Sequence, residues 1–245
     1  MTQLKKMPLL SGLCAGLGFF CLLLRQWLTG TGLDEKGLLL PGQPVEILIW
    51  VVTAAICMLL IWAFFTWEKH TTCQFSNEPL SAVATLFLAL GYVIALLQLA
   101  KPLDLLGLIN FVLGVVSVLC MALVAWGQFR GQRMHPLLYC CNILFHLAFM
   151  LLQYPGWSRE AQPQMYLFQL VGCAGMLVTV FCRAELAAGK ISGRNYAVFS
   201  RGALFFCIAA VAHCGQPLMY LCFALSIVLD GCRLQQKQPK AEQGE

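Results

Sequence analysis

Apolar segments long enough to cross a membrane recur along the whole chain. A bilayer core about 30 Å thick needs roughly 20 residues in a helix that rises about 1.5 Å per residue. Six runs are close to this length, at residues 7–24, 47–67, 80–100, 105–127, 137–154 and 165–182, and charge or proline lies in each break between them. We expect each run to be a membrane-spanning helix.

The composition points to lipid as the surrounding solvent. Of the 245 residues, 60% are hydrophobic and only 11% are charged, whereas about a quarter of the residues in a soluble domain are charged. Water would not solvate such a surface, but lipid accepts it. The sequence therefore predicts an all-α integral membrane protein with one polytopic membrane domain over residues 1–245, a short cytoplasmic tail at residues 235–245 and the lipid bilayer as its main partner.

The last apolar stretch, residues 202–232, is too long for one ordinary span. Its 31 residues would form a helix of roughly 46 Å. Gly215 is closely followed by Pro217 in its middle, and this combination usually ends a helix. We divide the region into spans at residues 196–214 and 217–234, which gives about eight transmembrane helices in all.

The positions of Lys and Arg give an independent test of that division. With eight spans, 12 of the 16 fall on one side of the membrane, and the other side receives Arg25, Lys36, Lys101 and Arg159. Treating the last stretch as one span would reduce the asymmetry to nine against seven. Because cytoplasmic loops carry the excess of Lys and Arg, we expect a plasma (inner) membrane protein with both termini in the cytoplasm. The basic residues form no dense stripe, so we expect no nucleic-acid partner.

Two similarities within the chain favour an internal repeat. A tight Pro-Leu hairpin occurs at residues 101–104 and again at 215–218, about 115 residues later, and residues 8–10 and 136–138 both read Pro-Leu-Leu. Both fit a parallel repeat of four plus four spans, with halves at residues 1–128 and 129–236. Leu-rich membrane helices also resemble one another by chance, and the sequence leaves both interpretations open.

One polar stripe lies within the fifth apolar run. His146 is near its middle, Asn142 is one helical turn earlier on the same face, and Tyr139 and Gln153 extend the stripe. Imidazole, amide and phenol groups can bind a neutral polar solute or handle a proton. The alternative is that they form hydrogen bonds that hold neighbouring helices together.

Several polar residues share one depth in the predicted topology. The outer third of the spans contains Gln98, Asn110, Gln153, Gln169 and His213. Because unpaired amides are costly to bury, we expect either a wet vestibule or a ring of mutual hydrogen bonds. If it is a vestibule, it opens outward and ends near His146, and the candidate ligand-binding residues are His146, Asn142, Gln153, Gln169, Gln98 and Asn110.

Charged and small residues indicate how the helices sit in the membrane. No Asp, Glu, Lys or Arg is expected deep within a span, because Arg25, Glu46, Glu185, Arg201 and Asp230 fall near predicted helix ends. Asp230 is expected to pair locally with Arg233, three residues away. Gly12 and Gly16 have the small-xxx-small spacing that lets a second helix approach closely.

Signatures of catalysis are missing from the chain. It has no G-x-S-x-G, no H-E-x-x-H and no P-loop, and no Cys or His spacing typical of a zinc site. We therefore expect no enzyme activity, no catalytic residues, no metal and no cofactor. A third class, an enzyme acting on lipid through His146, lacks a visible nucleophile or metal partner.

Two functional interpretations stay open. The polar stripe and the repeat favour a carrier or receptor for a neutral or apolar small molecule. The missing motifs, the short loops and the lack of a soluble domain favour a non-catalytic membrane subunit or scaffold of a larger complex, with a partner membrane subunit. The sequence alone does not decide between these interpretations.

Overall fold

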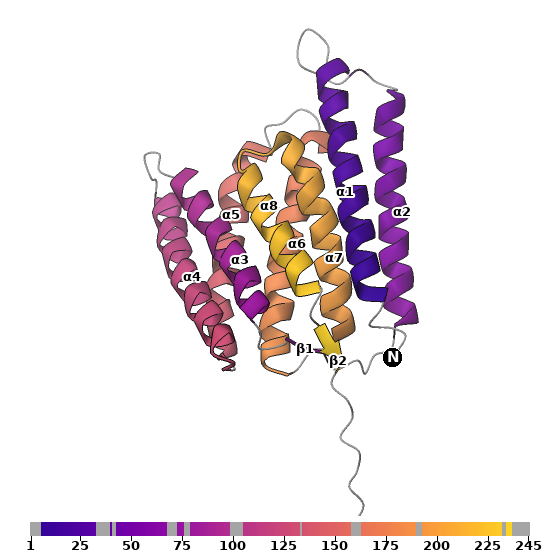
Figure 1. Cartoon of the computed structure of the whole chain (residues 1–245). Helices are drawn as coiled ribbons and strands as arrows, with labels where there is room; N and C mark the ends of the chain where they lie inside the picture. The colour runs from indigo at the N-terminus through magenta and orange to yellow at the C-terminus, as the bar shows by residue number, and fades with distance from the viewer. Residues whose placement is uncertain are drawn as a thin grey trace, which may run out of the picture.

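The computed structural model describes residues 6–32, 40, 43–67, 73–75, 79–98, 105–132, 134–157, 163–189, 193–231 and 234–236. Within these ranges the chain forms eight α-helices that run up and down in one bundle (Figure 1). They are α1 (Lys6–Thr31), α2 (Pro44–Thr66), α3 (Pro79–Gln98), α4 (Leu105–Phe129), α5 (Cys140–Trp157), α6 (Pro163–Ala187), α7 (Gly193–Ala210) and α8 (Pro217–Gly231). The bundle is all-helical, as predicted.

Short elements flank the helices. A 3-10 turn, η1 (Pro136–Tyr139), leads into α5, and another, η2 (Val211–His213), follows α7. The strands β1 (Cys73–Phe75) and β2 (Leu234–Gln236) pair antiparallel. This pair lies at the end of the bundle where α1 begins and α8 ends, which we name the terminal end, and the opposite end is the distal end (Figure 1).

Six helices, α1 to α6, are long and apolar enough to cross a membrane. Large apolar side chains cover the outer faces of α2 and α4, and Phe65 is 78% exposed. A surface of this kind supports a multi-pass membrane protein. The eight-span count is not confirmed, because α7 carries Arg194 and Arg201, and α8 has only 15 residues, about 22 Å of helix.

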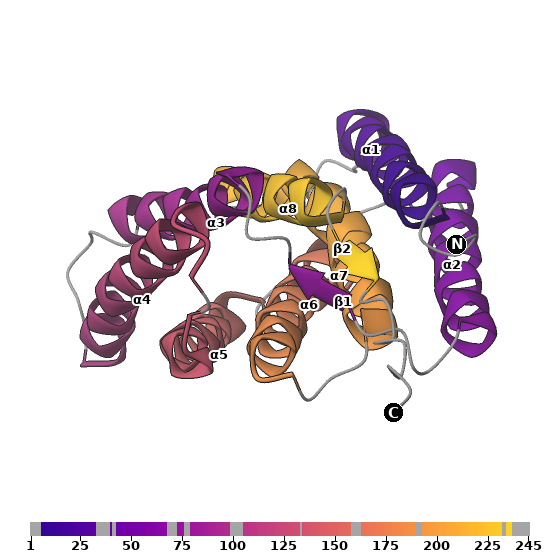
Figure 2. The same cartoon turned by 60° about the horizontal axis from the view of Figure 1, so that its bottom comes forward.

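The helices α3 to α8 form a closed ring. Each packs on the next in chain order, and α8 packs on α3 to close the ring, while α1 and α2 lie outside it against α7 (Figure 2). The four-plus-four repeat is not confirmed by this packing. In such a repeat α3 would correspond to α7 and α8 to α4, so the α3–α8 contact would require an equivalent contact between α7 and α4. These two helices occupy opposite positions in the ring.

Close helix approach depends on glycines that the sequence pattern did not single out. A Cβ added at Gly91 on α3 would lie 3.1 Å from the Cβ of Cys222 on α8, so the missing Cβ lets these two helices pack closely where the ring closes. A Cβ at Gly18 on α1 would lie 3.1 Å from the carbonyl oxygen of Phe205 on α7. Gly12 and Gly16 have nothing within 4 Å, so the predicted packing pair was wrong.

The helices α1 and α6 continue furthest past their predicted ends. The run 7–24 was ended at Arg25 and the run 165–182 at Arg183, but α1 continues to Thr31 and α6 to Ala187. Both arginines are buried against other helices, so neither marks the end of a span. The predicted division before Pro217 is confirmed, because α8 begins there.

Candidate functional site: a polar path along the ring axis

A polar cavity of about 140 Å³ lies at the distal end of the ring. Gln98 on α3, Gln153 on α5 and Gln169 on α6 line it, together with Cys214 and Gln216 from the link into α8. The cavity reaches the surface, because Gln98 is exposed. Three of the six predicted binding residues therefore meet in one place, although they come from three different helices.

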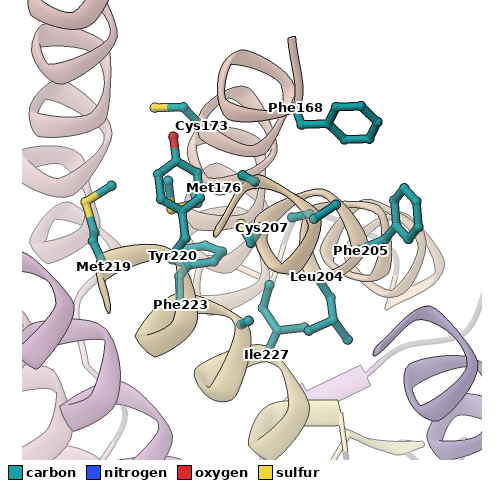
Figure 3. Close-up of a cluster of buried hydrophobic side chains, with 14 of the residues drawn as sticks. Phe168, Cys173, Met176, Leu204, Phe205, Cys207, Met219, Tyr220, Phe223 and Ile227 are labelled. Atoms are coloured by element: carbon teal, nitrogen blue, oxygen red, sulfur yellow. The ribbon is translucent and has the colours of Figure 1, made fainter. Parts of the chain in front are cut away.

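Aromatic side chains close the inner end of this cavity. Phe149 on α5 and Tyr220 on α8 line it, and both are almost fully buried. The Tyr220 hydroxyl donates a hydrogen bond to the carbonyl oxygen of Gln169, at 3.0 Å. Figure 3 shows Tyr220 reaching from α8 towards α6, with Phe223 beside it. Its lining includes Phe149, one helical turn from His146 on the distal side, but not His146 itself.

His146 is fully buried inside the ring. Its Nε2 atom lies 3.0 Å from the hydroxyl oxygen of Tyr92 on α3, which makes a hydrogen bond. The rings of Tyr92 and Phe223 meet the imidazole edge-on, with centroid distances of 5.3 and 6.0 Å. Tyr92 was not singled out from the sequence, since a tyrosine in a Leu- and Ala-rich span gives no sign of its partner.

Two polar atoms of the α5 stripe have no hydrogen-bond partner among the described residues: Nδ1 of His146 and Oδ1 of Asn142. Asn142 is also fully buried, and its Nδ2 donates to the carbonyl oxygen of Leu138 at 3.2 Å. A buried unsatisfied group costs about 1–3 kcal/mol. The stripe therefore offers two unused hydrogen-bonding positions, one on the imidazole and one on Asn142.

Asn110 lies apart from this path. It is fully buried on α4, does not line the cavity, and neither side-chain polar atom has a hydrogen-bond partner within the described structure. The side chain of His213 lies outside the described residues. The predicted set thus divides into three cavity residues, the pair Asn142 and His146 deeper on α5, and Asn110 elsewhere.

A buried charged cluster, which we name the triad, lies towards the terminal end of the ring. It consists of Arg183 on α6, Tyr196 on α7 and Asp230 on α8. Arg183 forms an ion pair with Asp230, and the two side chains are only 3% and 4% exposed. The Tyr196 hydroxyl donates to Asp230 at 2.9 Å, and Arg183 also donates to Ser226 at 3.3 Å.

Other buried polar side chains lie between the triad and the distal cavity. Tyr139, at the start of the α5 stripe, is buried, and so is the hydrogen-bonded pair of Tyr92 and His146. Beyond this pair, Phe223 packs on the His146 ring and Phe149 lines the distal cavity. Together these groups form the candidate site.

The expectation that the charged residues near helix ends are anchored at the membrane surface was wrong for four of them. Arg25, Arg183, Arg201 and Asp230 are all buried in the bundle, and Asp230 pairs with Arg183, 47 residues away. The predicted partner Arg233 lies outside the described residues. One sequence signal for this pair was available. Arg183 and Asp230 both fall near the terminal ends of their helices, so two opposite charges lie at a similar depth in the bundle and could pair.

Comparisons with known proteins return no relative. No protein-family model matches the chain, and neither a curated protein nor a solved structure matches it. Among the described residues, no group of three or more His, Cys, Asp or Glu could hold a metal ion. The geometry of the axis is therefore the basis for assigning a function.

Proposed function

We propose that this chain is a non-enzymatic carrier for a small neutral polar solute, which moves along the ring axis. The observation that carries the proposal is the convergence of Gln98, Gln153 and Gln169 on one distal cavity. The cavity, of about 140 Å³, has room for a solute of the size of glycerol or urea.

The chemistry of the lining supports a neutral solute. Amides, a thiol and a phenol line the cavity, and all can exchange hydrogen bonds with hydroxyl or amide groups. The charges of Arg183 and Asp230 neutralise each other at the far end of the axis. Beyond Phe149, the unpaired atoms of His146 and Asn142 would offer the solute its next hydrogen bonds.

We further propose eight spans in the plasma membrane, with the terminal end in the cytoplasm. The ring supports the count, because α7 and α8 each pack beside helices of membrane-spanning length. The charge asymmetry supports the orientation even after the buried arginines are set aside: without Arg183 and Arg201 on one side and Arg25 on the other, it is ten against three.

Osmotic swelling of proteoliposomes tests the carrier without knowledge of the natural solute. Vesicles shrink in hyperosmotic glycerol, erythritol or urea and reswell as the solute enters, and light scattering follows the rate. We expect the protein to accelerate reswelling for at least one of these solutes. Gln153→Leu should slow that solute about fivefold, because it removes a hydrogen bond from the path.

Gln26→Leu is the matched control, because Gln26 is exposed on α1, outside the ring. This variant should transport like the wild type. If no solute in the panel enters faster than into empty vesicles, the carrier proposal fails. The alternative, a non-catalytic subunit or scaffold of a larger complex, would then be favoured, with the exposed apolar face of α2 as the surface for a partner.

A further inference from the structure

An apolar groove of about 530 Å³ lies between α2, α6 and α7, on the outside of the ring. On α7 its lining runs from Val198 to Phe206, which corresponds to about 12 Å along the helix. One leaflet contributes about half of a hydrocarbon core of about 30 Å. The groove therefore has nearly the depth of a single leaflet, and on α7 it begins five residues after the start of the helix.

The groove is open towards lipid. Ile61, Phe65 and Phe199 line it and are exposed, and the lining groups are almost entirely apolar. Gly202 helps to hollow it, because a Cβ added there would meet only the Leu60 side chain, at 3.4 Å. An apolar chain could therefore lie along the groove and contact α2 on one side and the ring on the other.

Arg194 marks the terminal mouth of this groove. It lies one turn before Val198 on α7, and its guanidinium carbon is 4.3 Å from the centroid of the Phe64 ring, which is part of the lining. One guanidinium nitrogen donates weakly to the Trp67 carbonyl oxygen at 3.5 Å, while Nε is buried without a hydrogen-bond partner. The Arg194 guanidinium thus has an unsatisfied N–H group at the edge of the apolar groove.

The electrostatics at this mouth are positive. No carboxylate pairs with Arg194 in the part of the chain that the structure describes, and the first turn of α7 contains no acidic residue. The start of a helix carries unpaired backbone N–H groups and a partial positive charge, both of which favour an anion. Arginine binds phosphate oxygens in a planar, bidentate manner.

We propose that this groove binds one anionic phospholipid, with its phosphate at Arg194 and the start of α7 and one acyl chain between α2 and the ring. A zwitterionic headgroup would bring its own cation towards the same positive mouth, and a free phosphate would leave the groove unfilled. The lipid occupies the seam between α2 and the ring, so it stabilises the docking of the outer α1–α2 pair.

Native mass spectrometry of the full chain in detergent tests the site, with phosphatidylglycerol and phosphatidylcholine of identical acyl chains as probes. The wild type should retain phosphatidylglycerol about fivefold more strongly, the effect of one basic residue on an anionic headgroup. Arg194→Gln should lose this preference and Arg194→Lys should keep most of it. Gly202→Leu should reduce the retention of both lipids, because its side chain fills the groove.

Arg130→Gln is the matched control. Arg130 also stacks on an aromatic ring, with its guanidinium carbon 4.5 Å from the Trp126 ring centroid, but it does not border the groove. This variant should bind both lipids like the wild type. Equal retention of the two lipids by the wild type, unchanged selectivity of Arg194→Gln, or unchanged binding by Gly202→Leu would each overturn the proposal.

Discussion

Asp230→Asn should destabilise the protein more than most single substitutions, because it breaks a buried ion pair. Both partners are at least 96% buried, so water cannot solvate the Arg183 charge once the carboxylate is gone. The bonds from Arg183 to Tyr196 and Ser226, both at 3.3 Å, are too long to replace it. Leaving one such charge uncompensated costs about 3–5 kcal/mol of unfolding free energy.

The double replacement Arg183→Met/Asp230→Leu separates this cause from simple loss of packing. Removing both charges with side chains of similar volume is often neutral or stabilising. We therefore expect the double variant to lie within about 1 kcal/mol of the wild type, whereas Arg183→Met and Asp230→Leu alone should each cost about 3–5 kcal/mol, which gives a coupling energy of about 5 kcal/mol or more between the two sites. Glu185→Gln, on the same helix but half-buried, should change stability by less than about 0.5 kcal/mol.

Equilibrium unfolding in mixed micelles with increasing dodecyl sulfate, followed by far-UV circular dichroism, measures these differences. The reasoning fails if Asp230→Asn costs less than about 1 kcal/mol, since a buried ion pair that holds α6 to α8 should cost more than an ordinary surface change. It also fails if the double variant loses as much stability as the two single variants together.

Three further outcomes are expected. Tyr92→Phe should cost about 1–3 kcal/mol in the same unfolding assay, because it leaves Nε2 of His146 unsatisfied, and adding His146→Leu should recover most of the loss. Gly18→Leu should push α1 from α7 and lower the melting temperature, whereas Gly16→Leu, where nothing lies within 4 Å, should not. Reporter fusions in the C-terminal tail and in the α1–α2 connection should report opposite sides of the membrane, and the same side for both would contradict the proposed topology.

Sequence length and apolarity predicted most of the helices, because a membrane span must satisfy its own backbone and bury an apolar surface in lipid. The break before Pro217 was also predictable, since glycine and proline act locally. The shared depth of Gln98, Gln153 and Gln169 was predictable from topology, but depth alone did not decide between a cavity and a ring of hydrogen bonds, and it did not separate these residues from Asn110.

The burial of Arg25 and Arg201 could not be predicted in this way, because their partners are distant in the chain. Arg25 donates to the Ala209 carbonyl oxygen at 2.6 Å, and Nε of Arg201 donates to Ser11 at 3.0 Å. Each bond joins α1 to α7 across more than 180 residues. The local sequence shows only an arginine near the end of an apolar run, and a snorkelling arginine has the same local sequence.

The packing indicates where the ring can open. A Cβ added at Gly175 on α6 would lie 3.0 Å from Cα of Ala203 on α7, and Gly91 brings α3 equally close to α8. These two tight pairs are joined at the terminal end by the Arg183–Asp230 ion pair. The distal cavity lies between them, with α5 at its side. We therefore expect the distal end to open while the triad holds the terminal end together.

Electron–electron distance measurements between spin labels on α3 and α6 test this hinge. One pair, at Leu97 and Tyr166, spans the distal end, and the other, at Leu80 and Ala187, spans the terminal end. In a chain whose native cysteines have been replaced, the distal distance should broaden or shift when the transported solute of the swelling assay is added, and the terminal distance should stay constant. In the Asp230→Asn variant the distance between the terminal labels should also change, because the ion pair that holds this end together is absent. In the protein with an intact triad, a terminal distance that changes more than the distal distance would contradict this hinge, because the helices move least at the end where they are held together.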